Sequence, residues 1–457
     1  MTGLRRSVRG DRLRRTAAAA LALATVLASG CASYSTIRNR PITNGADRAG
    51  YVIATPGADD LRSGDVTLIL AFSGGGARAA ALAYGVLLEL RDTPVRLQGR
   101  SRRLLDEVDV ITSVSGGSFT AAYFGLYGDR TFETFEHDFL RRNAAAEIRH
   151  ALFNPLFWFS RRSRSELVVD YYERAVFKGA TFADLQRAAG PRIVINATDL
   201  GGGVRFSFTQ EYFDLLCSDL ASFPLARAVT ASSAVPVLFT PVVVENFDGC
   251  GTAGFEWLDR MRRRVAGSPD LSEVIQGLRS YADKDRRRYI HLIDGGVTDN
   301  LGLRALYEYI EVGGGIETVL QRMERKPAPR FAIISVNAST RPATQMEASA
   351  RAPTLEQTID AVTDVQLHRY NAATLEQMQA SMHRWSEALS TPSLTVEPYF
   401  VRIDFSGIPQ THRRRFLNQI PTSLSIEGDH VDALIQAGRE LLRDNAEFRR
   451  FVADLGR

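Results

Sequence analysis

Residues 66–78 read VTLILAFSGGGAR, and the expected fold class follows from their pattern. Its first seven residues are continuously apolar and partly β-branched, which predicts a strand buried on both faces of a parallel sheet. A glycine run follows, and residues 79–90, AAALAYGVLLEL, then predict an apolar helix. Strand, glycine loop and helix form the entrance to an α/β unit, so we expect an α/β protein.

The glycine run has three possible uses. Glycines let the backbone turn tightly and direct N–H groups at a bound anion. Gly74, Gly76 and Ala79 fit the dinucleotide pattern G-x-G-x-x-A, but residues 94–97 offer none of the acidic side chains that such a site needs. The Gly-Lys-Ser/Thr of a phosphate-binding P-loop is absent. The third use is an oxyanion hole, which requires a nucleophile elsewhere in the chain.

A second strand pattern supplies that nucleophile. Residues 108–114, VDVITSV, are followed by Ser115-Gly116-Gly117-Ser118 and by a helical stretch, FTAAYFGLYG. A serine between strand and helix, flanked by small residues, is the nucleophile-elbow arrangement. Ser113 occupies the place of the first glycine in G-x-S-x-G and could itself be the nucleophile. We favour Ser115, because a glycine follows it two places later; a purely structural turn is the alternative.

An aspartate ends a third strand pattern. Residues 289–293, YIHLI, precede Asp294-Gly295-Gly296. This places the carboxylate at the carboxyl edge of the sheet, where α/β sites lie. The alternative is a turn aspartate that bonds its own backbone. Asp299 and Asn300 are predicted to be helix caps for the stretch that follows them.

Together, SGGGAR, SVSGG and DGG in this order resemble the patatin-like phospholipases. Residues 196–200 (NATDL) and 231–236 (ASSAVP) extend the resemblance. It implies a three-layer α/β/α fold with a largely parallel central sheet, in a catalytic domain over residues 63–457. It also implies a serine hydrolase that cleaves the acyl esters of a phospholipid or lysophospholipid, with no metal and no cofactor.

The resemblance also assigns roles to single residues. Ser115 would be the nucleophile and Asp294 the base, in a dyad rather than a triad. Gly75 and Gly76 would supply oxyanion N–H groups, with Gly74 shaping the loop. Arg78 would accompany this oxyanion hole, and either orients the loop or meets a phosphate.

Two alternatives remain open. A Ser-Asp-His triad needs a later histidine, for which there are four candidates: His368, His383, His412 and His430. A non-catalytic lipid-binding envelope lipoprotein on the same fold is the alternative function; the presence of every expected catalytic residue argues against it.

The N-terminus is predicted to direct export of the protein and to anchor it to a membrane. Residues 1–30 form a signal peptide with a basic start and an apolar core of 13 residues at 16–28, which is too short to span a bilayer. Ser29-Gly30-Cys31 resembles a lipobox, which implies cleavage before Cys31 and acylation of that cysteine. Ala32 implies the outer membrane of the bacterial envelope, facing the periplasm. Residues 31–62 are rich in turn formers and are predicted to be the lipidated tether. An ordinary secretion signal is the alternative.

Charge and cysteine content indicate which partners and which covalent links to expect. Six arginines and one aspartate give residues 1–30 a net charge of +5, which leaves −1 for the rest of a chain whose total is +4. This balance gives no sign of a nucleic-acid partner. Export favours a disulfide between Cys217 and Cys250 over two buried thiols. Three cysteines without metal-ligand spacing argue against a zinc site.

Residues 152–164 combine aromatic side chains with arginines. Such a segment suits an interfacial lid that touches lipid. Core packing with a solvated charged end is the interpretation we prefer. Further along the chain, residues 355–390 predict a long polar helix.

Overall fold

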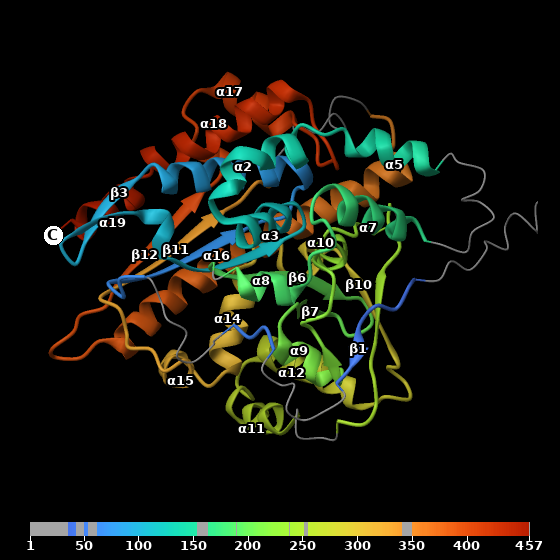
Figure 1. The fold of residues 1–457 in the computed structure, drawn as a ribbon, viewed down its shortest axis with the longest axis horizontal. Helices are drawn as coiled ribbons and strands as arrows, with labels where there is room; N and C mark the ends of the chain where they lie inside the picture. Colours follow the sequence, from blue (N-terminus) through green and yellow to red (C-terminus); the bar gives the residue numbers. More distant parts are fainter. Residues whose placement is uncertain are drawn as a thin grey trace, which may run out of the picture.

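The computed structural model describes residues 35–42, 50–53, 62–152, 163–188, 190–236, 238–250, 255–340 and 350–456 (Figure 1). Cys31, the signal peptide and most of the aromatic segment at 152–164 lie outside these ranges. No helix in the described part of the chain has both the length and the apolar character needed to cross a membrane.

A mixed sheet of eight strands forms the centre of the fold. Five of its strands are parallel, in the spatial order β12 (Glu397–Ile403), β11 (Arg330–Val336), β2 (Val66–Phe72), β5 (Val108–Val114) and β6 (Arg192–Asp199). Three further strands complete the sheet: β7 (Val204–Ser207) and β10 (Tyr289–Ile293) pair with opposite edges of the end of β6, and β9 (Val242–Glu245) pairs with β10. The predicted strands at 66–72, 108–114 and 289–293 match β2, β5 and β10 residue for residue.

Helices cover both faces of this sheet, which confirms the predicted α/β class. Figure 1 shows α2 and α18 on one side of the strands and α14 and α15 on the other. The first layer contains α2 (Gly76–Arg91), α3 (Gly116–Tyr127) and α18 (Gly428–Asp444). The second contains α14 (Leu303–Val312), α15 (Ile316–Arg322) and the long helix α16 (Leu355–Leu389). Continuous burial of β2 and β5 follows from this double cover.

Shorter helices and two small strand pairs complete the fold. The helices are α4 (Thr131–Phe135), α5 (Ala144–Leu152), α7 (Arg164–Ala175), α8 (Phe182–Arg187), α9 (Gln210–Leu215), α10 (Leu225–Ser232), α11 (Glu256–Arg264), α12 (Pro269–Arg279), α13 (Gly296–Asp299), α17 (Thr411–Gln419) and α19 (Ala446–Leu455). The strand pairs are β1 (Arg40–Pro41) with β8 (Ser218–Asp219), and β3 (Pro94–Leu97) with β4 (Arg100–Arg103).

One predicted strand runs in an unexpected direction. Our reasoning for Asp294 assumed the carboxyl end of a strand that runs with its neighbours. Instead β10 is antiparallel to β6, with Leu292 opposite Asp199 and Ile293 opposite Thr198. Strand β6 extends beyond the end of β5, and β10 runs back along this extension. Asp294 therefore arrives beside the end of β5 from the opposite direction.

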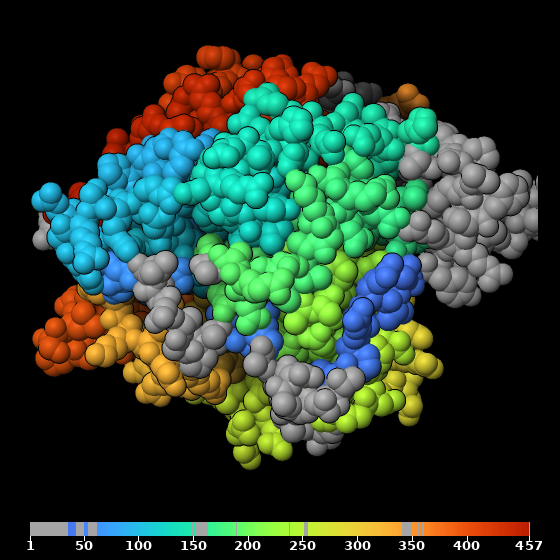
Figure 2. Space-filling view, in the orientation of Figure 1, coloured from blue at the N-terminus to red at the C-terminus, as the bar shows by residue number. Residues whose placement is uncertain are grey.

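Part of the predicted tether belongs to the folded domain. The Asn39 amide donates to the carbonyl of Glu245 at 2.8 Å, and its Oδ1 accepts from the N–H of the same residue. Tyr51 is buried, and its hydroxyl accepts a 2.7 Å hydrogen bond from the Ile193 N–H in β6. Figure 2 shows the blue N-terminal residues lying against the green and yellow middle of the chain. The boundary at residue 63 is therefore wrong for residues 35–42 and 50–53, because their side chains complete the edge of the domain.

A disulfide joins Cys217 to Cys250, with a Cα–Cα distance of 5.4 Å and a sequence separation of 33. We expect the Cys217→Ser/Cys250→Ser double variant to lose roughly 3–4 kcal/mol of unfolding free energy, because the chain-entropy model gives that value for a loop of this length. Urea unfolding of both proteins measures the difference. Reductant should lower the stability of the wild type to that of the double variant and leave the variant unchanged; equal stabilities without reductant would contradict the prediction.

Candidate active site

Ser115 lies on a strained turn between β5 and α3. Its backbone angles are φ 49° and ψ −121°, in a region that non-glycine residues rarely adopt. The side-chain hydroxyl donates a 2.9 Å hydrogen bond to Oδ2 of Asp294. Both residues are nearly buried, with 5% and 8% of their surface exposed. The turn thus directs a serine hydroxyl at a carboxylate that arrives from 179 positions further along the chain.

A second serine holds this turn in place. The Ser115 N–H donates to Oγ of Ser232 at 2.8 Å, and the Ser232 hydroxyl donates in turn to the Asn196 carbonyl. Ser232 ends α10, so this helix and β6 together support the strained backbone. Ser232 lies in the stretch 231–236 that resembles the family, but no local pattern in the sequence indicates this contact.

Asp294 is fixed through both its backbone and its carboxylate. Its N–H donates to the carbonyl of Ala234, and Oδ1 accepts a 2.7 Å hydrogen bond from the N–H of Gly296. Burial raises the pKa of Asp294 to about 6, while the hydrogen bonds from Gly296 and Ser115 oppose the rise. Such a carboxylate is ionised at neutral pH and is still a better proton acceptor than an exposed aspartate.

The glycine loop lies directly over the serine. A Cβ added at Gly74 would be 3.4 Å from the Cβ of Ser115. The Gly74 N–H is already used, because it donates to the carbonyl of Asn300 at 3.0 Å. The N–H groups of Gly75 and Gly76 have no hydrogen-bond partner within the described ranges. These two donors are therefore the ones available to an oxyanion, as the resemblance implied, and Gly74 shapes the loop.

Asn300 has a larger role than the predicted helix cap. Besides accepting from Gly74, it donates through Nδ2 to the hydroxyl of Ser339 at 3.0 Å. Its Oδ1 occupies the place that a Cβ at Gly74 would need. One feature of the sequence could have indicated this role: Asn300 follows Asp294 by only six residues.

The contacts of Arg78 fit the first of its two possible roles, which is to orient the glycine loop. Nε donates to the Ala338 carbonyl, Nη1 to the Ile420 carbonyl and Nη2 to the Thr422 hydroxyl, at 2.6–2.9 Å. Each guanidinium nitrogen thus has a protein acceptor, and burial lowers the pKa of Arg78 to about 10. The side chain ties the start of α2 to two distant segments.

The elbow and the glycine loop touch through Gly116. A Cβ added there would collide with the backbone of Gly76. We expect Gly116→Ala to lower kcat by roughly 10²-fold or more, because displacing one oxyanion donor has effects of this size. It should also cost about 1–3 kcal/mol of unfolding free energy through overpacking. Ester hydrolysis and urea unfolding measure the two effects.

Gly267→Ala is the matched control for this substitution, because Gly267 is exposed and an added Cβ there meets nothing within 4 Å. This variant should behave as wild type in both assays. Equal activity of the two alanine variants would show that the contact between the loops does not matter.

The alternative catalytic residues lie elsewhere. The Ser113 hydroxyl donates to the Val194 carbonyl at 3.2 Å within the sheet. His383 and His412 are exposed, and Nε2 of His368 lies 2.9 Å from the Thr340 carbonyl. Within the described residues, no hydrogen bond to the side chain of Ser115 or Asp294 involves a histidine. The geometry favours a dyad over a triad.

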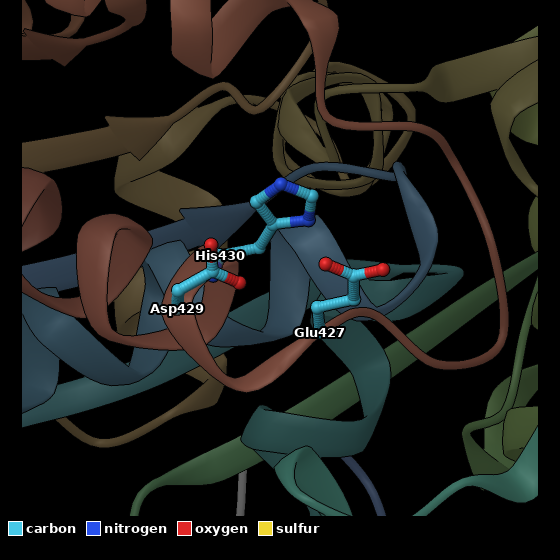
Figure 3. Close-up of side chains that lie close together, drawn as sticks. All are labelled: Glu427, Asp429 and His430. Atoms are coloured by element: carbon cyan, nitrogen blue, oxygen red, sulfur yellow. The ribbon is translucent and has the colours of Figure 1, made fainter.

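One group of possible metal ligands lies at the surface. Glu427, Asp429 and His430 offer ligand atoms within 4.8 Å of one another at the start of α18 (Figure 3). Both acids are exposed, and Oδ1 of Asp429 accepts the N–H of His430 at 2.9 Å. Acidic residues are stabilising at a helix N-terminus without any ion. This explains the cluster, and the expectation of no metal stays a prediction.

One protein family matches this chain. A family model described as patatin-like phospholipase matches residues 70–307, a range that contains the glycine loop, Ser115 and Asp294. No curated protein matches the chain. Among solved structures, human GIVD cytosolic phospholipase A2 is 12% identical, with a TM-score of 0.42 over 86% of this chain and 62% of that chain. The same human protein in complex with methyl gamma-linolenyl fluorophosphonate is 12% identical, with a TM-score of 0.36 over 93% of this chain and 69% of that chain.

Proposed function

Because this chain belongs to the patatin-like phospholipase family, we propose that it is a serine lipid acyl hydrolase whose catalytic pair is Ser115 and Asp294. The match confirms the resemblance predicted from the three motifs. The observation that carries the proposal is the 2.9 Å hydrogen bond from Ser115 to Asp294 on a strained turn beside the glycine loop. Strain of this kind persists where the surrounding structure over-determines the turn, as Ser232 does here.

The proposed reaction follows from these contacts. Asp294 takes the proton of the Ser115 hydroxyl while Oγ attacks the ester carbonyl carbon. The resulting oxyanion accepts hydrogen bonds from the N–H groups of Gly75 and Gly76 at the start of α2, where the helix dipole also favours negative charge. Asp294 then returns the proton to the departing alcohol. Water, deprotonated by the same carboxylate, then attacks the carbonyl carbon of the acyl-serine. The bond to Oγ breaks, the fatty acid leaves, and Asp294 returns the proton to Ser115.

We further propose that the substrate is a phospholipid or lysophospholipid. Fatty-acid release from mixed phospholipid vesicles tests this, with headgroup and chain position followed by mass spectrometry. Release of fatty acid together with a lysolipid supports the proposal. Vesicle binding by the wild type without any release would contradict it and favour a lipid-binding protein.

The proposed location is the bacterial outer membrane, with Cys31 acylated and the domain facing the periplasm. The support is sequence alone: an apolar core, small residues before Cys31 and alanine after it. We expect Cys31→Ser to lose the lipid and to leave the membrane fraction, because two or more acyl chains are what hold such a protein firmly. Metabolic labelling with a clickable fatty acid and fractionation measure both effects. Unchanged labelling of the variant would show that the anchor lies elsewhere.

A further inference from the structure

A cavity away from the proposed catalytic pair lies on the face of the sheet that α14 and α15 cover. Its volume is about 500 Å³, and neither Ser115 nor Asp294 lines it. Its walls come from β2, β5, β11 and the two helices: Ile69, Val110, Leu306, Ile310, Val319 and Phe331. This volume falls within the range of about 300–1,000 Å³ that is usual for small-molecule sites.

The walls of this cavity favour an apolar occupant. Most of the side chains that line it are aliphatic or aromatic, and Ile69, Val319 and Phe331 are themselves at most 5% exposed. Protein interiors are normally close-packed, so side chains around an unfilled space of this size lack the dispersion contacts that a ligand would supply. A hydrocarbon chain supplies such contacts without requiring polar partners.

The mouth of the cavity is charged. Asp109 is buried there, with Oδ1 2.8 Å from Nη1 of Arg325 and 3.2 Å from Nε of Arg62. Burial raises the pKa of Asp109, and both arginines oppose the rise. The exposed residues Lys326 and Glu324 complete the rim. The mouth therefore carries three basic side chains and two carboxylates, which leaves a net positive charge. This charge favours an anionic head group over a cationic one.

We propose that this cavity binds a long-chain fatty acid, with the chain between the sheet and α15 and the carboxylate at the mouth near Lys326. One apolar space with one charged opening suits an amphiphile with a single chain. The site is separate from the proposed hydrolytic site and goes beyond the proposed function, so it stands even for a protein that lacks hydrolytic activity.

Titration of the purified full chain with dansylundecanoic acid, followed by dansyl emission and by displacement with oleate, tests this proposal. We expect saturable binding. Leu320→Trp fills the cavity from α15 and should weaken the affinity at least tenfold. Gln321→Trp places the same side chain at the exposed neighbouring position, which does not line the cavity, and should keep the affinity within about twofold.

If Leu320→Trp does not fold, two charge-reversing variants test the same proposal. Lys326→Glu should weaken binding about three- to fivefold, the effect of one exposed charge interaction of up to about 1 kcal/mol. Arg322→Glu, at an exposed position outside the cavity, should leave it unchanged. No saturable binding by the wild type, or equal affinities within both pairs of variants, would overturn the proposal. Neither result depends on hydrolysis, so failure here and failure of the proposed function are distinguishable.

Discussion

Ser115→Ala is expected to reduce kcat/KM for ester hydrolysis by roughly 10⁴-fold or more, because removal of a serine nucleophile leaves only what the oxyanion hole and binding supply. The variant loses the hydroxyl that donates to Asp294 and keeps the backbone N–H that holds the turn to Ser232. Fatty-acid release from vesicles and hydrolysis of a soluble ester measure the loss in two independent assays.

Ser113→Ala is the matched control, two residues earlier on the same chain. The Ser113 hydroxyl contacts only the Val194 carbonyl among the described residues, and Asn196 also donates to that carbonyl. Its activity should stay within about threefold of wild type. A large loss in Ser113→Ala with retained activity in Ser115→Ala would reverse the assignment.

The strained turn adds a stability readout to the same experiment. A residue in a sparsely populated backbone region costs about 1–3 kcal/mol, and glycine tolerates positive φ without that cost. Ser115→Gly should therefore be inactive and yet at least as stable as the wild type in urea unfolding. A clear loss of stability would show that the hydroxyl serves the fold rather than the reaction.

Asp294→Asn is expected to lower kcat/KM by roughly 10²–10⁴-fold, the usual contribution of a positioned base. The amide is close to isosteric with the carboxylate but accepts no proton at neutral pH. Wild-type activity should rise with pH through about 6, where Asp294 ionises, and then level off. The variant should show no such rise, and a pH–rate profile of both proteins measures this.

The same substitution should stabilise the protein at neutral pH. The pKa of Asp294 is raised from 3.8 to about 6 on folding, so the folded state favours the protonated form. The contribution of Asp294 to stability is thus full below about pH 4 and falls as the pH rises through 6, by about 3 kcal/mol in all. Asp294→Asn should escape this loss. We expect equal stabilities near pH 4 and a more stable variant near pH 7; the opposite order would argue that the carboxylate is a structural partner.

Local patterns were sufficient to identify three central strands and the residues that end them. The runs at 66–72 and 108–114 are rich in Val, Ile and Leu, because both faces of these strands are covered, and a serine followed by glycine marks the end of each. Family membership followed from three short motifs for a similar reason, since each motif combines a strand with the glycines that its turn requires.

The contacts between these motifs could not be predicted from the sequence. Asn300 and Ser232 carry ordinary polar side chains, and their roles exist only because the chain brings them against Gly74 and Ser115. Arg78 has the position of a family residue, but its partners come from two segments more than 250 residues further on. A hydrogen bond between residues so far apart in the chain produces no repeating pattern in the sequence.

The residues that could carry the chemistry are recognisable from local sequence: a serine on a tight turn, an aspartate at the end of a strand and a glycine run. How they meet depends on the packing of the whole chain. Strand direction is the clearest case, since the run at 289–293 reads the same whether β10 is parallel or antiparallel. Its direction depends on which backbone groups of β6 remain to be paired, and that is a property of the assembled sheet.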